Sequence, residues 1–74
     1  MSREIRLVYA HLQERKGDLE TTLLKVNEQV VQAHLRCDRT MRDVMLAARA
    51  HVDTSLREVQ NAMDFVAHFI IPDL

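Results

Sequence analysis

The feature that most constrains the fold of this chain is a repeat of apolar residues that runs almost from end to end. Apolar side chains recur every three or four residues from Ile5 to Ile70, and Arg15 is the one charged position in the series. The mean step is about 3.6 residues, which is the period of a straight α-helix. The sequence therefore predicts an all-α protein in which one apolar stripe lines one face of the helices.

Two short segments interrupt this pattern and set the expected helix boundaries. Gly17 is the only glycine, and it follows basic residues and precedes Asp18, which favours a break or kink there. Thr40 and Asp43 resemble a helix-capping pair, which favours a turn at residues 37–40. The predicted helices span residues 3–16, 19–36 and 40–71, and the first two are either separate or continuous.

The length of the chain limits how much core it can form. A single domain of 74 residues is in the range where one hydrophobic core is marginal and association often supplies the missing stability. We expect one helical interaction domain over residues 1–74, folded as an antiparallel helical hairpin with or without a short extra N-terminal helix. The hairpin is predicted to assemble into a helical bundle by oligomerisation or by docking a partner.

A second set of apolar residues lies off the main stripe, and a hairpin alone would leave many of them in water. This set is Leu24, Val31, Leu35, Val44, Leu46, Phe65, Phe69 and Ile71. Residues 65–71 are apolar nearly all round, so the C-terminal end is the expected centre of an interface with a second copy or another protein. The residues predicted to anchor that interface are Val44, Met45, Met63, Phe65, Val66, Phe69 and Ile70.

The composition indicates which partners the protein is expected to bind and in which cellular compartment it is expected to lie. The net charge is −1, with 10 basic and 11 acidic residues, so no broad field attracts nucleic acid or anionic membrane. Cys37 is the only cysteine, which favours a reducing compartment. The longest apolar run is too short to span a bilayer, and the N-terminus has no signal-peptide pattern. We expect a cytoplasmic protein.

The histidines are candidate metal ligands. Asp38 follows His34 by four residues and Asp64 precedes His68 by four, a spacing that places each pair on one helical turn. The four histidines are nonetheless scattered along the chain, so we expect neither a metal site nor a cofactor; they are His11, His34, His51 and His68.

Cys37 lies three residues after His34, as a nucleophile and its base could. A catalytic pair also needs a pocket and an oxyanion site, which a small helical domain with one glycine does not evidently provide. Cys37 is therefore predicted to be a small core residue on the apolar stripe, and no enzymatic activity is expected.

One local basic cluster supports an alternative function, that of a small dimeric regulator contacting nucleic acid. The cluster is Arg36, Arg39, Arg42 and Arg49, which would contact phosphates. Asp38 and Asp43 interleave with these arginines, and no aromatic residue is near enough to stack on bases. A solvated face with salt bridges is the preferred interpretation.

The leading hypothesis is a non-catalytic protein–protein interaction module: a small adaptor, co-chaperone, inhibitor or oligomerising subunit. In length and general layout the chain resembles the small cytoplasmic helical-hairpin co-chaperones of bacterial secretion systems. That resemblance concerns architecture and implies a helical hairpin that buries an amphipathic face against a partner.

Overall fold

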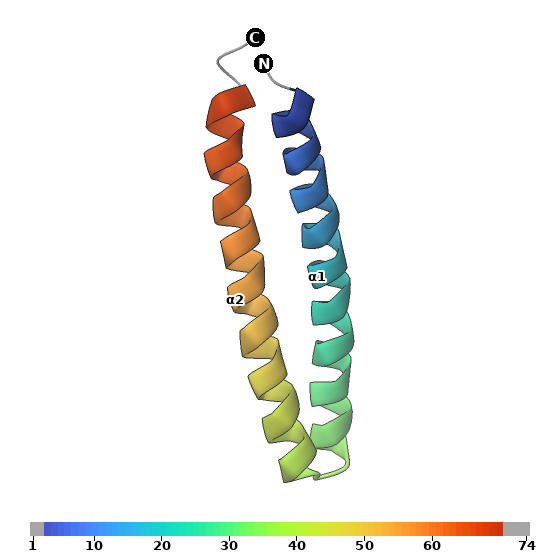
Figure 1. Cartoon of the computed structure of the whole chain (residues 1–74). Coiled ribbons are helices and arrows are strands. Elements are labelled where there is room, and N and C mark those ends of the chain that lie inside the picture. The colour runs from blue at the N-terminus through green and yellow to red at the C-terminus, as the bar shows by residue number, and fades with distance from the viewer. Residues whose placement is uncertain (1–2, 71–74) are drawn as a thin grey trace.

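The computed structural model describes residues 3–70, which form two antiparallel helices. Helix α1 spans Arg3–Leu35 and helix α2 spans Arg39–Ile70, with a short turn between them. The helices lie side by side, and the first turn of α1 is at the same end of the molecule as the last turn of α2 (Figure 1). The molecule is a rod of 54 × 15 × 14 Å. The predicted all-α helical hairpin is confirmed; Ile71 and Pro72, where the last helix was expected to end, lie outside the described residues.

The expected break at Gly17 does not occur: α1 continues through this residue. The hydroxyl of Thr21 donates a hydrogen bond to the Gly17 carbonyl at 3.1 Å, and the hydroxyl of Thr22 donates to the Asp18 carbonyl at 2.9 Å. A glycine inside a helix costs only about 1 kcal/mol relative to alanine. Packing against α2 on both sides of Gly17 outweighs that penalty, so no separate N-terminal helix forms.

The contact between the helices follows a seven-residue repeat. In α1 the partly or fully buried residues, apart from Asn27, fall alternately three and four positions apart: Ile5, Tyr9, Leu12, Lys16, Leu19, Leu23, Val26, Val30 and Ala33. The corresponding residues of α2 are Arg42, Met45, Arg49, Val52, Leu56, Val59, Met63 and Val66. We call these two sets together the core seam. A mean step of 3.5 residues is the repeat of a left-handed coiled coil.

The core seam departs from the predicted stripe at several positions. The stripe was predicted as one continuous helical phase through the whole chain, whereas the chain reverses at residues 36–38 and each helix takes its own register against the other. Val8 and Met41, both on the predicted stripe, are 48% and 43% exposed. Arg15 is also exposed, which removes the one charged residue from the predicted stripe.

Burial in the hairpin is shallow. Among residues 3–69, four side chains are buried: Ala33 on α1, and Val52, Val59 and Met63 on α2. One helix can cover only one face of another, so the remaining members of the core seam stay partly open to water. The hairpin therefore has a line of contact rather than a three-dimensional core.

We predict that Gly17→Ala stabilises the hairpin by about 0.5–1 kcal/mol, because alanine loses less backbone entropy on folding. Beyond its two chain neighbours and the local helix backbone, a methyl group at this position would meet no atom within 4 Å. The control is Ala10→Gly at an exposed position of the same helix, which should destabilise the hairpin by a similar amount. Urea unfolding followed by circular dichroism at one protein concentration measures both, and a lower midpoint for Gly17→Ala would contradict the structure.

Candidate protein-binding surface

The turn between the helices is closed by backbone hydrogen bonds. The Asp38 N–H donates to the Ala33 carbonyl at 2.9 Å, and the Cys37 N–H donates to the His34 carbonyl at 3.1 Å. This pair of bonds is the Schellman motif, whose penultimate residue adopts the left-handed conformation. Cys37 occupies that position with φ of 57° and is exposed. The prediction that Cys37 is a core residue is wrong, because the position that reverses the chain lies outside the helical contact.

Asp38 begins the second helix. Its Oδ1 accepts a hydrogen bond from the Met41 N–H at 3.0 Å, and its carbonyl accepts one from the Arg42 N–H at 3.0 Å. These are the bonds of an N-cap residue. The predicted capping residue, Thr40, lies instead within the first turn of α2. The turn was therefore placed correctly along the chain, but its cap lies two residues earlier than expected.

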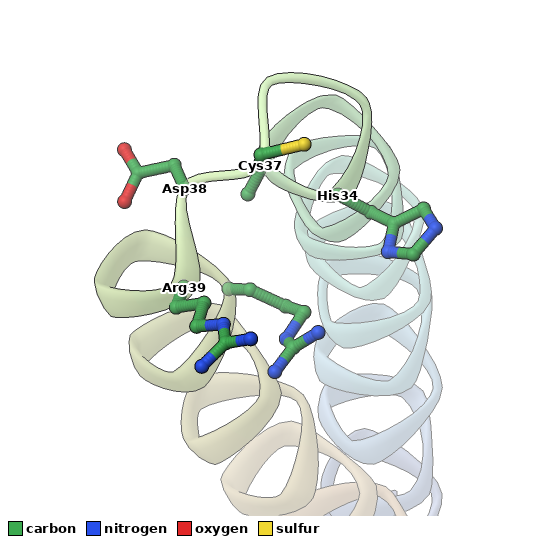
Figure 2. Close-up of a pocket in the computed structure, with 6 residues that line it drawn as sticks. His34, Cys37, Asp38 and Arg39 are labelled. Carbon is green, nitrogen blue, oxygen red and sulfur yellow. The ribbon is translucent and has the colours of Figure 1, made fainter.

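The turn surrounds a shallow depression of about 180 Å³, drawn in Figure 2. Its lining residues are Ala33, His34, Cys37, Asp38, Arg39 and Arg42. In this view the imidazole of His34 and the carboxylate of Asp38 point to opposite sides. The recorded hydrogen bond between His34 and Cys37 joins their backbones, and none joins the imidazole to the thiol. The depression therefore does not bring a nucleophile and a base into hydrogen-bonded contact.

The carboxylates that were considered as metal ligands already have partners. Asp38 caps α2, and Asp64 Oδ1 accepts a hydrogen bond from Gln60 Nε2 at 3.0 Å. Within residues 3–70, no three His, Cys, Asp or Glu side chains gather in an arrangement that could hold a metal ion.

The four arginines of the alternative function do not form one open face. Arg36 and Arg39 are exposed at the turn, whereas Arg42 and Arg49 belong to the core seam and are partly buried. Arg42 Nε lies 3.7 Å from Asp43 Oδ1, too far for a hydrogen bond but close enough for an ion pair. Partial burial of this kind is common for arginine, because the apolar stem can lie along apolar surface while the charged end stays in water.

A second seven-residue repeat runs along α2 beside the core seam. Each of its members directly precedes a residue at a core-seam position, so the repeat is rotated by about 100° around the helix. We call it the outer seam: Met41, Val44, Ala48, His51, Ser55, Glu58, Ala62, Phe65 and Phe69. Its apolar ends are open to solvent, with exposed fractions of 53% for Val44 and 63% for Phe65. The middle of the outer seam carries His51, Ser55 and Glu58, so its large apolar residues lie toward the two ends of α2.

The outer seam ends in an apolar cavity where the two helices terminate. Ile5 and Val8 of α1 and Phe65, Val66 and Phe69 of α2 line a space of about 230 Å³. The rings of Phe65 and Phe69 meet edge to face, with centroids 5.3 Å apart and planes at 66°. The two rings therefore contact each other, and both side chains remain exposed to solvent.

The structure divides the predicted interface residues between the two seams. Val44, Phe65 and Phe69 lie on the outer seam, whereas Met45, Met63 and Val66 lie on the core seam. Met63 is only 6% exposed, so the hairpin itself encloses it. The side chain of Ile70 is outside the description. Sequence analysis did not identify Met41, Ala48 and Ala62 as members of this surface, although each precedes a core-seam position by one residue.

Helix α1 carries a smaller apolar patch on a different face. Leu24 and Val31 are 66% and 55% exposed and lie with Asn27, Glu28 and Gln32 around a shallow groove. Leu35, at the end of the helix, is also exposed, whereas Leu46 of α2 is partly buried. The polar side chains around Leu24 and Val31 make this patch shorter and more mixed than the outer seam.

Comparisons with protein-family models, curated proteins and solved structures found no match to this chain. Over residues 3–70, neither helix contains an apolar stretch long enough to cross a membrane.

We predict that Cys37→Gly stabilises the hairpin by about 1 kcal/mol, because glycine adopts positive φ without the steric penalty of a side chain. Cys37→Ala is the matched control: it removes the thiol but keeps the β-carbon, so it should leave stability nearly unchanged. Thermal and urea unfolding under reducing conditions measure both variants. Equal stabilisation by alanine and glycine would show that the thiol, rather than the backbone conformation, sets the effect.

Proposed function

We propose that this chain is a non-catalytic protein–protein interaction module that buries the outer seam of α2 against another helix. The observation that carries the proposal is that the large apolar residues of the outer seam, Met41, Val44, Phe65 and Phe69, are exposed in the hairpin. Its function would be to complete a helical bundle with a second copy or another protein, as an adaptor, co-chaperone, inhibitor or oligomerising subunit does.

The surface area of the hairpin supports this proposal. A folded monomer of 8.6 kDa should expose roughly 4,700 Å², whereas this chain exposes 5788 Å². The difference, about 1,000 Å², exceeds the roughly 800 Å² that each partner loses in a standard protein interface. One helical contact along the outer seam would bring the exposed area per residue into the normal range.

The chemistry of the outer seam also favours a protein partner over nucleic acid. Its ends carry Met41, Val44, Phe65 and Phe69, and methionine and aromatic side chains are enriched where protein interfaces are fully desolvated. The nucleic-acid alternative has less support, because Arg42 and Arg49 are partly buried and only Arg36 and Arg39 are exposed at the turn. A cytoplasmic location is part of the proposal and is consistent with the exposed free thiol of Cys37.

The proposal predicts that the outer seam contacts protein in cells. With a photo-crosslinking amino acid in place of Val44, irradiation should give covalent adducts of discrete mass. The matched control places the same amino acid at Ala50, which is exposed on the side of α2 turned away from the outer seam. Phe65→Asp should lower the partner affinity by roughly thirty-fold and remove the adducts formed from Val44. If Val44 gives no more adduct than Ala50, the outer seam is not a binding surface.

A further inference from the structure

The order of residues along the outer seam is symmetric about Ser55. Glu58 lies three positions after Ser55, and His51 lies four positions before it. These are the two titratable residues of the seam. Seven positions away on either side is an alanine, Ala48 or Ala62. The large apolar residues come last: Met41 and Val44 at one end, Phe65 and Phe69 at the other. Read from either end, the seam therefore presents large, small, polar, small and large residues.

A surface with this order is complementary to itself when two copies run in opposite directions. A two-fold axis through Ser55 would place Ala48 opposite Ala62 and Val44 opposite Phe65 of the second copy. It would also place Met41 opposite Phe69, beside the open apolar cavity that Phe69 and Val8 line. Symmetric dimers use such self-complementary patches, in which residue i meets residue j and j meets i.

The two titratable residues of the seam, His51 and Glu58, favour the antiparallel arrangement over the parallel one. His51 and Glu58 are exposed, and within the described chain neither side chain has a hydrogen bond or an ion pair. Antiparallel pairing brings His51 next to Glu58 of the second copy twice, once on each side of the axis. Parallel pairing would instead place Glu58 next to Glu58, and like charges facing each other across an interface are unfavourable.

The distribution of side-chain size fits two helices that cross near Ser55. Helices packed at an angle are closest at the crossing point and separate toward their ends. Ala48, Ser55 and Ala62 leave room for close approach in the middle, and the larger residues at both ends would fill the widening space.

We propose that the outer seam is the interface of a symmetric dimer in which α2 packs antiparallel against α2 of a second copy, with the two-fold axis near Ser55. This inference rests on the function proposed above and names its partner. The area that the hairpin exposes beyond the expectation for a folded monomer of its mass, about 1,000 Å², is what such a contact would bury. Four helices, two from each copy, would then form one bundle.

Sedimentation of the purified chain tests the stoichiometry, and a charge exchange tests the orientation. The unchanged protein should sediment at twice the 8.6 kDa of one chain. His51→Glu should weaken the dimer by at least about ten-fold, because glutamates then face each other on both sides of the axis. Adding Glu58→Lys to His51→Glu restores opposite charges only in the antiparallel arrangement, so the double variant should regain the dimer.

Disulfide trapping tests the pairing of residues directly. In a Cys37→Ser background, the double variant Ala48→Cys with Ala62→Cys should form covalent dimers under mild oxidation. Ala48→Cys alone should not, because the two copies of residue 48 would be roughly 21 Å apart in the antiparallel dimer. Trapping by Ala48→Cys alone would indicate parallel helices and overturn the proposal.

The failure of this inference can be told apart from failure of the proposed function. A chain that sediments as a monomer up to the limit of its solubility overturns the symmetric dimer. Adducts from Val44 to a protein of different mass would then leave the interaction module standing with another partner. A dimer that forms but is unaffected by Phe65→Asp, while Ala50→Asp disrupts it, would place the interface elsewhere and overturn both.

Discussion

The packing of α1 against α2 along the core seam determines both the continuity of α1 and the position of the outer seam. The seam runs along both helices of the 54 Å rod, and its contacts on either side of Gly17 keep α1 continuous through that residue. It also fixes which residues of α2 are turned away from α1. Because a residue that precedes a core-seam position is rotated by about 100° around the helix, the core seam places the outer seam on an open side of the hairpin.

The turn makes this packing possible by reversing the chain in three residues. Cys37 accepts a left-handed conformation that most residues avoid, and Asp38 caps the helix that follows. The local penalty at Cys37 is offset by the helical contact that the reversal allows. The depression at the turn is thus explained by chain reversal, and the surface with the features of a binding site lies along α2 instead.

The fold could be predicted from the sequence because its signals are periodic and local. The helical repeat, the turn near Cys37 and the apolar surplus at Val44, Phe65 and Phe69 all follow from spacing. The remaining details depend on tertiary contact. A single helical phase counted through the turn does not account for the chain reversal at residues 36–38, so the predicted stripe includes Met41, which is exposed. Gly17 was overestimated as a breaker because its penalty is small beside the packing on either side.

The composition of the outer seam carries information that the hairpin itself does not require. Positions of α2 that face water in a two-helix fold are free to be polar, and Asp53, Arg57 and Asp64 show that many are. Exposed apolar residues nevertheless recur at Met41, Val44, Phe65 and Phe69 in the same seven-residue register. Scattered exposed apolar residues are ordinary, but large apolar residues exposed in one register at both ends of the same helix favour a second helical contact. This composition supports the proposal that the hairpin packs against another helix.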